Sequence, residues 1–399
     1  MTAPPANPVV HIGRWHDELT AFRRDLHRHP ELGFEERRTG QLVCERLRAL
    51  GIEHHAGVGR TGIVAVVRGQ SDSAGRSVGL RADMDALPMH EDNAFEHRSR
   101  YDGRMHGCGH DGHTTMLLAA ARYLHETRRF DGTVYLFFQP GEEGHAGAKA
   151  MIDDGLFERF PAQSVCALHN WPALAPGQFG ITPGPAMAAA DRIEITIDGR
   201  GGHGAHPHAA VDPVLVAGHI IAAVQSIVSR NVSPIDTAVV SLCAMQAGNP
   251  AAMSVIPSHA TLVGTVRTFR PATQDMIERR LAELVPSIAA AFGASARVKY
   301  ERVYPATVNH AREAEFAATV AEALIGPGNV VRNLDPSMGS EDFSFMLQAK
   351  PGAFARLGQG GIEGGCFLHN SLYDFNDAVI PLGAGYLAAL AETAMPIAK

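Results

Sequence analysis

The chain has 399 residues, of which 45% are hydrophobic and 19% are charged, an ordinary composition for a globular protein. This length allows two domains and at least one large core. The formal net charge is −7 and no long basic run occurs, which argues against nucleic acid or an anionic membrane as a partner.

The N-terminus and the cysteines bear on where the protein works. Residues 1–10 are rich in Pro and Ala and lack a basic segment followed by an apolar core, so we expect no signal peptide. We also expect no membrane span, because no apolar run approaches the length of a bilayer crossing. An odd number of scattered cysteines indicates reduced thiols in the cytoplasm rather than a disulfide framework. The five are Cys44, Cys108, Cys166, Cys243 and Cys366.

The first half of the chain alternates predicted helices and strands. Apolar residues at helical spacing around 19–26, followed by Pro30, predict a first helix, and a second is predicted over 35–50. Another helix is predicted after His113. Short apolar runs predict strands buried on both faces, which gives an α/β domain of three layers with a central, mostly parallel sheet. These runs are 63–67, 78–82, 134–138 and 165–168.

The pattern changes near residues 182–185, where Thr and Gly alternate with two prolines. The next hundred residues predict two helices with about four strands, a compact α+β unit inserted into the first domain. The predicted pieces are 193–197, 213–228, 238–245, 260–269, 274–292 and 296–300.

The α/β pattern returns after Tyr304-Pro305. Helices are predicted near 311–324 and 341–348, then a strand at 353–357 and a closing helix over 377–394. The sequence therefore predicts a discontinuous domain, 1–187 with 303–399, and an inserted domain, 188–302.

The residues that carry chemistry follow predicted strands or open predicted helices. Cys108 and His110 lie two residues apart, so both can point to the same side of an extended loop, and both ligate metals when deprotonated. The dipole of the following helix should lower the pKa of the Cys108 thiol. Glu142 and Glu143 follow a Pro-Gly turn and cannot both face the same way. One can ligate a metal while the other stays free as a base.

His169 and His369 also follow apolar runs, as do Asp83 and Asp85. In open α/β sheets, ligand sites form beyond the carboxyl ends of strands, so these side chains are candidates for one hydrolytic metal site. Taken alone, Cys108 could be a small buried hydrophobic residue, each histidine a hydrogen-bonded one and the glutamates a solvated face. A structural zinc site fits poorly, because such sites prefer close C-x-x-C pairs. A Cys-His-Asp nucleophile would leave the glutamate pair unexplained.

These residues belong to motifs that occur in order along nearly the whole chain. The chain resembles the amidohydrolase branch of the aminoacylase and carboxypeptidase-like dinuclear metallohydrolases, which includes hippurate hydrolases, auxin-conjugate hydrolases and N-acetyl-diaminopimelate deacetylases. The matching motifs are RRDLHRHPEL (23–32), LRADMDALP (80–88), MHGCGHDGH (105–113), QPGEE (139–143), GGHGAHPH (201–208), GTVRTF (264–269), GSEDF (339–343) and LHN (368–370).

The resemblance implies a role for each residue of the metal site. Cys108 would bridge two divalent metal ions, and the other ligands would be His110, Glu143, His169 and His369. Glu142 would be the general base. Asp85 would not bind a metal itself but would orient a residue that does. Thiolate, imidazole and carboxylate ligands suit zinc, and manganese, cobalt, nickel or iron also fit such a set.

The resemblance also assigns roles to the inserted domain, as a lid and dimerisation domain. His203 would hold the tetrahedral oxyanion, from the same subunit or from a partner in a homodimer or homotetramer. Arg267 would bind the substrate carboxylate. Ser254 stands where the family usually has a substrate-holding Asn, and its shorter side chain reaches less far. As alternatives to these roles, His203 could be a turn residue and Arg267 a surface charge at a strand edge.

Taken together, these features predict a metal-dependent hydrolase that cleaves the amide bond of N-acyl amino acids. A dipeptidase or aminoacylase with the same site is one alternative. A catalytically silent protein that captures a small acylated ligand is another. Assays with N-acyl amino acids and dipeptides would separate them.

Overall fold

The computed structural model describes residues 7–361 and 366–397. The N-terminal residues 1–6, on which the signal-peptide expectation partly depends, lie outside the described residues. The chain divides into two compact units. The first unit comprises Met1–Ala186, Thr307–Asp335 and Asp342–Lys399. The second unit comprises Met187–Ala306 and Pro336–Glu341.

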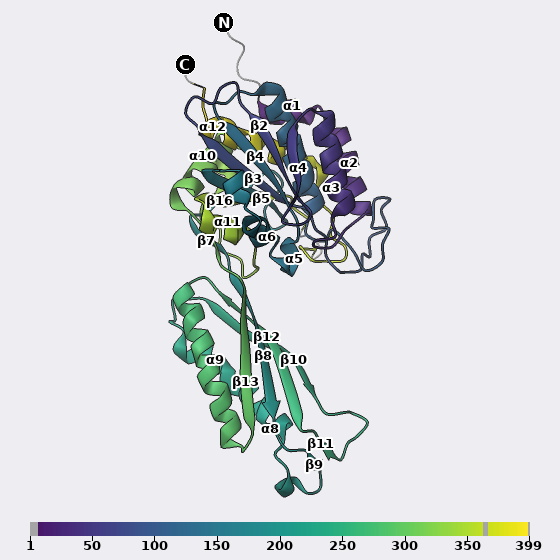
Figure 1. The fold of residues 1–399 in the computed structure, drawn as a ribbon, viewed down its shortest axis with the longest axis vertical. Coiled ribbons are helices and arrows are strands. Elements are labelled where there is room, and N and C mark those ends of the chain that lie inside the picture. Colours follow the sequence, from purple (N-terminus) through teal and green to yellow (C-terminus); the bar gives the residue numbers. More distant parts are fainter. Residues whose placement is uncertain (1–6, 362–365, 398–399) are drawn as a thin grey trace. The chain divides into compact units, whose positions relative to one another are not determined.

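The first unit is built on an eight-stranded sheet in the order β1-β2-β4-β3-β5-β16-β6-β15 (Figure 1). The four strands β4, β3, β5 and β16 run parallel, whereas β2 is antiparallel to β4 and β6 to β16. Central strands such as β3 and β16 are buried along their whole length, which explains their short, mostly apolar runs. The strands are β1 Glu53–Val58, β2 Gly62–Arg68, β3 Ser77–Asp83, β4 Thr133–Gln139, β5 Ser164–Trp171, β6 Phe179–Gly180, β15 Val330–Val331 and β16 Gly352–Gly358.

Helices cover both faces of this sheet, which gives the predicted three layers. Phe138 packs into the core that the longer helices share, while its neighbour Phe137 points to the other face and contacts Phe157 of α7. The helices of the first face are α1 Pro8–Gly13, α2 His16–Arg28, α3 Arg37–Ala49, α4 His110–Thr127, α10 Ala311–Ile325 and α12 Ile380–Ala394. The others are α5 Glu142–His145, α6 Gly147–Asp153, α7 Leu156–Arg159 and α11 Phe343–Ala349.

The second unit is a four-stranded antiparallel sheet, in the order β10-β12-β8-β13, with two helices packed on it. Burial alternates along β12, because only one face of this sheet is covered. Its core joins sheet residues such as Ile195 and Leu262 to helix residues such as Ile220 and Leu281. The elements are β8 Ala189–Asp198, α8 Pro213–Ser226, β10 Ala238–Ala247, β12 His259–Thr268, α9 Pro271–Ala291, β13 Ser295–Tyr304 and the short strands β9 Gly202–His203 and β11 Val255–Ile256.

The structure differs from the sequence expectations at one helix start and in one additional strand. The helix expected after His113 begins three residues earlier, at His110. The antiparallel edge strand β1 was not expected, because its residues are mostly polar or exposed and lack an apolar run. The remaining short strands are β7 Gly184–Met187 and β14 Thr307–Asn309.

One expectation about apolar length is wrong. The helical segment Pro213–Asn231 has 19 residues and a mean hydropathy of 1.4, so by length and composition alone it could cross a membrane. This is weak support for a span, because a core helix of a soluble protein passes the same test. Val216, Ile220 and Val224 on this helix bury against the sheet of the second unit, which accounts for part of its apolar character.

Candidate metal centre

Three neighbouring parallel strands deliver side chains to one edge of the large sheet. Asp83 is the last residue of β3, Glu142 follows the end of β4, and His169 lies near the end of β5. Because β3 pairs in parallel with both β4 and β5, the carboxyl ends of all three strands lie together.

Cys108 and His110 lie at the same sheet edge, on a tight turn that leads into α4. Gly109 between them is the residue before the helix and has a φ of +92°, a conformation that favours glycine. A Cβ on Gly109 would also lie 2.5 Å from the Tyr373 hydroxyl oxygen. This turn therefore needs glycine both for its backbone and for space.

The structure brings together all five side chains predicted as metal ligands. Cys108 Sγ lies 3.5 Å from His169 Nε2, and His369 Nε2 lies 3.1 Å from Glu143 Oε1. Ligand atoms of Cys108, Glu143 and His369 all lie within 4.8 Å of one another. Ligand atoms of His110, Glu142 and Glu143 also lie within 4.8 Å of one another.

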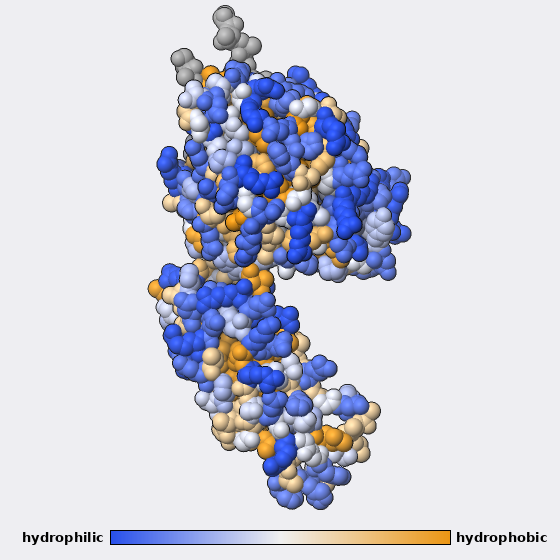
Figure 2. Space-filling view, in the orientation of Figure 1, coloured by the Kyte–Doolittle hydropathy of each residue, from blue (hydrophilic) through white to orange (hydrophobic). Residues whose placement is uncertain are grey.

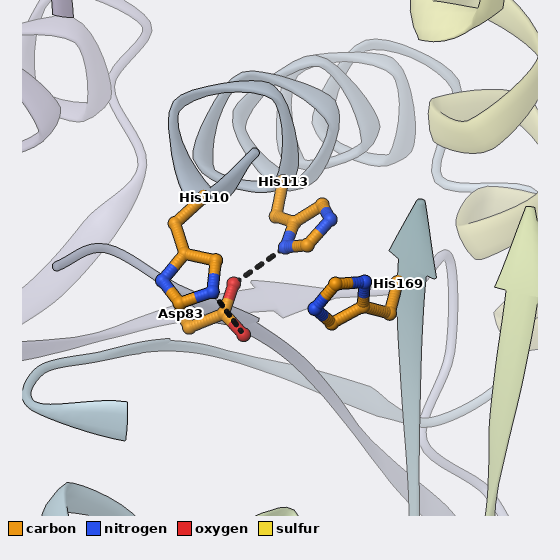
Figure 3. Close-up of side chains that lie close together, drawn as sticks. All are labelled: Asp83, His110, His113 and His169. Atoms are coloured by element: carbon orange, nitrogen blue, oxygen red, sulfur yellow. Dashed lines mark hydrogen bonds and ion pairs between the residues drawn. The ribbon is translucent and has the colours of Figure 1, made fainter. Parts of the chain in front are cut away.

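Two residues outside the five predicted ligands join this centre: Asp83, already a candidate because it ends a predicted strand, and His113, which was not expected there. Asp83 and His113 lie with His110 and His169 in one buried group, with the Asp83 carboxylate between the rings of His110 and His113 (Figure 3). Asp83 Oδ1 accepts a hydrogen bond from His113 Nδ1 at 2.6 Å. The signal that could have found His113 is its position one helical turn after His110, on the same side of α4.

His169 is oriented so that one nitrogen faces the other ligands. Its Nδ1 donates to the backbone oxygen of Asn170 at 2.7 Å, which leaves Nε2, the atom near Cys108, with a free lone pair. Burial, followed by the nearby rings of His113 and His110, holds the pKa of His169 well below its usual value. A neutral imidazole with a fixed outer hydrogen bond is the form that ligates metals.

The centre carries an excess of negative charge. Burial alone would lower the pKa of His110, but the carboxylates of Asp83, Asp85 and Glu143 outweigh it and raise the pKa to about 10. Neither ring nitrogen of His110 makes a hydrogen bond, although both are buried. Buried imidazole nitrogens that lack hydrogen bonds and lie among converging carboxylates fit divalent cations.

The pKa of Cys108 differs from the expectation. Burial, together with the charges of Glu143 and Glu142, raises this pKa well above the usual value for a thiol. The prediction that the helix dipole lowers it is therefore wrong, because burial and full negative charges outweigh the partial charge of a helix end. A thiolate at Cys108 needs cations beside it.

Asp85 holds the turn that carries the two glutamates. Its Oδ1 accepts from the backbone N–H of Glu142 and its Oδ2 from that of Glu143, both at 2.9 Å. Asp85 Oδ1 also lies 3.4 Å from His110 Nδ1. The carboxylate is thus placed to orient the turn and a neighbouring ring.

A buried ionic network lies next to the centre. Arg23 donates to both carboxylate oxygens of Asp377 and, at 2.9 Å, to Asp374. His27 Nδ1 lies 2.8 Å from Asp111, the residue that follows His110 in α4. The network therefore joins α2 to the start of α4 and to the segment that follows His369.

In the second unit, the structure places His203 beside Ser254. The strands β9 and β11 pair, so that His203 lies opposite Val255, and Gly204 N–H donates to the Ser254 oxygen at 2.6 Å. His203 Nδ1 accepts from Ala205 N–H, so the neutral ring carries its proton on the exposed Nε2. An outward N–H donor suits an oxyanion.

Arg267 does not join these two residues. It lies near the end of β12, between β10 and β8, so it is not at a sheet edge, and its guanidinium donates to Ser340 at 2.9 Å. The β11–β9 pair lies by the other end of β12, where Gly199 N–H donates to Ser258. At about 3.3 Å per residue, Arg267 and His259 are roughly 26 Å apart. Within one chain, His203 and Ser254 therefore lie far from Arg267.

Known proteins share this architecture and much of the sequence. A hippurate hydrolase from Campylobacter jejuni is 43% identical over 375 residues, which cover 94% of this chain and 96% of that protein. The IAA-amino acid hydrolase ILR1-like 5 of Arabidopsis thaliana is 38% identical over 94% of this chain and 86% of that protein. A crystal structure from Bacillus subtilis, described as a dinuclear metal binding peptidase from the M20 family, is 33% identical, covers 96% of this chain and 99% of that chain, and superposes with a TM-score of 0.82.

Residues 79–393 match the family described as Peptidase family M20/M25/M40. This range holds the carboxyl ends of β3, β4 and β5, the start of α4 and the whole second unit. The chain belongs to the peptidase family M20/M25/M40.

Proposed function

We propose that this protein is a metal-dependent amidohydrolase that cleaves the amide bond of N-acyl amino acids, with hippurate-like conjugates as the first class to test. The observation that carries the proposal is the convergence of one thiol, three imidazoles and Glu143 beside Glu142, which is buried. Relatives named as a hippurate hydrolase, an IAA-amino acid hydrolase and an N-acetylcysteine deacetylase support the substrate class.

Each side chain of the centre has a task in this reaction. Cys108, His110, Glu143, His169 and His369 would hold two divalent ions. Such ions, when bound, polarise a carbonyl and lower the pKa of a water molecule. Glu142 takes the proton of the attacking water and returns it to the leaving amine. Asp85 fixes the backbone of Glu142 and Glu143 through its two hydrogen bonds.

Arg267 would recognise the carboxylate of the amino-acid part of the substrate. Its guanidinium is half-buried, and among the described residues no carboxylate forms an ion pair with it. A half-buried guanidinium can bind a carboxylate with two parallel hydrogen bonds. Ser340 orients one edge of the guanidinium through its hydroxyl.

His203 would stabilise the oxyanion, and we place it in the active site of a second copy of the chain. The ends of β12 are about 26 Å apart, so His203 and Arg267 of the same chain are too far apart to contact one substrate molecule. We therefore propose that the second unit, near residues 188–302, is a lid and dimerisation domain in a homodimer or homotetramer. Ser254 would lie near the substrate together with His203.

The surface of the second unit supports a contact with another copy. β10 is an edge strand, with backbone groups open to pairing. Met245 on β10 is 55% exposed, Met253 just before β11 is 100% exposed, and Val255 in β11 is 61% exposed. Figure 2 shows apolar surface at this end of the unit. A pair of such edges would cover these side chains.

Zinc or manganese is the first choice of metal, because the proposed ligand set combines imidazole and thiolate groups with a carboxylate. Cobalt, nickel or iron are further candidates. We propose a cytoplasmic location and no nucleic-acid or membrane partner, in keeping with reduced cysteines and a net charge of −7.

Two other functions remain for comparison. A dipeptidase or aminoacylase would use the same centre with a different pocket. A silent binding protein would not need Glu142 buried beside the ligands. The test is metal analysis of the purified protein followed by hydrolysis assays on matched N-acyl amino acids and dipeptides. Turnover of hippurate-like substrates above dipeptides supports the proposal, whereas metal-loaded protein that binds products without turnover would establish the silent alternative.

A further inference from the structure

The turn before the two glutamates is fixed by three successive backbone N–H groups. Gly141 N–H donates to Glu36 Oε1 at 2.8 Å, and the next two N–H groups, of Glu142 and Glu143, donate to Asp85. Two buried carboxylates from distant parts of the chain thus accept hydrogen bonds from three consecutive peptide groups. Asp85 comes from the loop after β3, and Glu36 is the residue that precedes α3.

The side chain of Glu36 bonds to this turn and does not cap the helix that follows it, α3. It is fully buried. Its second oxygen, Oε2, accepts from the Thr61 hydroxyl at 2.5 Å. A buried carboxylate is costly unless its oxygens are satisfied, and here one partner comes from the loop before β2 and the other from the glutamate turn.

The turn needs this support because its backbone is unusual. Gly141 has a φ of +57°, and Glu143 has a ψ of 78°, so the helical hydrogen-bond pattern is broken where the glutamates begin. A turn that lacks helical bonds can rotate its peptide groups unless other acceptors hold them. Rotation at Gly141 would redirect the side chains of Glu142 and Glu143.

We propose that Glu36 is a positioning residue that aims Glu142 and Glu143 by holding the Gly141 peptide. The inference deepens the proposed function and rests on it for the role of Glu142. Glu36 does not itself reach the substrate. It acts through one backbone hydrogen bond, while Asp85 accepts from the next two N–H groups of the same turn.

The protonation state of Glu36 does not decide this task. Burial raises the pKa of Glu36, opposed by the Thr61 hydrogen bond and helped by the nearby Asp85, to about 7. Oε1 can accept from Gly141 N–H whether or not the carboxyl group is ionised. An amide oxygen at this position should therefore serve as well.

The test compares Glu36→Ala, Glu36→Gln and a matched control, Glu31→Ala. Glu31 also accepts two backbone N–H groups, those of Arg38 and Thr39 at the start of α3, but it does not touch the glutamate turn. Thermal midpoint, kcat, KM and the affinity for zinc, measured by chelator competition, are recorded for each variant.

We expect Glu36→Ala to lower kcat by about 10- to 100-fold and zinc affinity by about tenfold, with KM little changed, because a small misplacement of a catalytic group has effects of this size. Glu36→Gln should restore both quantities. Glu31→Ala should lower only the thermal midpoint. If Glu36→Ala does not fold, Glu36→Asp, which withdraws the oxygen by one methylene, takes its place.

Normal kcat and zinc affinity in folded Glu36→Ala would overturn the inference, and so would a Gln variant as defective as Ala. A wild-type protein that hydrolyses no amide would refute the proposed function instead. In that case the zinc comparison alone would still decide whether Glu36 positions Glu143.

Discussion

The sulfur of Cys108 lies 3.5 Å from Nε2 of His169, although 61 residues separate the two in the chain. Cys108 lies two residues before α4 begins, and His169 lies near the carboxyl end of β5. The contact links two ligand groups, because Cys108 also lies near Glu143 and His369, and His169 lies near His110.

Removing the thiol should damage metal binding most. We expect Cys108→Ala to weaken metal affinity by more than the roughly 10- to 100-fold that loss of an outer hydrogen-bond partner causes, because the thiolate would serve both ions. Competition with a chelator, followed by metal analysis, measures this. Cys166→Ala is the control, since Cys166 is equally buried on β5 but belongs to no ligand group. Equal metal content in both variants would return Cys108 to a packing role.

Glu142→Gln should retain both metals and the fold but lose turnover by roughly 100- to 10,000-fold, because only the proton transfer is removed. Steady-state kinetics together with metal analysis provide the measurement. Glu143→Gln makes the contrast, since it should lose metal as well as activity. A Glu142→Gln enzyme with near-normal kcat would show that another group is the base.

Arg267→Ala should raise KM for N-acyl amino acids by about tenfold or more, since a charge-assisted hydrogen bond contributes about 1.5–3 kcal/mol. The corresponding amides without a carboxylate should be hardly affected. Ser340→Ala, which removes only the neighbouring hydroxyl, should have a smaller effect. Equal losses on carboxylate and carboxamide substrates would make Arg267 a structural residue.

Ser254→Asn, which introduces the residue usual in the family, should improve or broaden activity if the shorter Ser merely weakens a contact to the substrate. Comparing kcat/KM over a panel of acyl groups measures this. Lower activity on every substrate would mean that the Ser254 environment has no room for the longer side chain.

Mixing two inactive variants should restore activity if His203 acts in a partner's active site. Equal amounts of His203→Ala and Glu142→Gln subunits, unfolded and refolded together, should reach about a quarter of wild-type activity, because half of the dimers are mixed and each holds one intact site. No recovery in mixtures that demonstrably contain mixed dimers would place His203 in its own subunit's site.

The buried ionic network should make stability depend on pH. Burial alone would lower the pKa of His27, but hydrogen bonds to Asp111 and Glu91 outweigh it and raise the pKa to about 9. Because the folded pKa lies above the unfolded value of 6.5, this stabilisation is fully present below pH 6.5 and is lost as the pH rises through 9. We expect a loss on the order of 1–3 kcal/mol across this window.

Denaturant unfolding of metal-free protein between pH 6 and 10 measures that loss. His27→Gln, which cannot titrate, should show a flatter profile over the same range. An unchanged slope in the variant would assign the pH dependence to other groups.

The sequence by itself determined much of the fold and most of the candidate centre. Buried parallel strands leave short, mostly apolar runs, so β3, β4, β5 and β16 could be predicted close to their observed bounds. Because the carboxyl ends of such strands meet at one edge, His169 and the glutamate pair could be expected near Cys108 before the fold was known. The edge strand β1 could not, because its residues show no apolar run.

Only the tertiary structure decided the electrostatics and the long-range geometry. The pKa of Cys108 is raised, not lowered, because charge and burial depend on which groups pack together, and local sequence shows only the helix end. The contact between His113 on α4 and Asp83 at the end of β3 joins two distant segments, so only the tertiary structure shows that they meet. The distance between Arg267 and His203 follows from strand length and pairing. Short-range patterns determine which elements form, whereas the packing of distant segments determines what charges and partners each side chain meets.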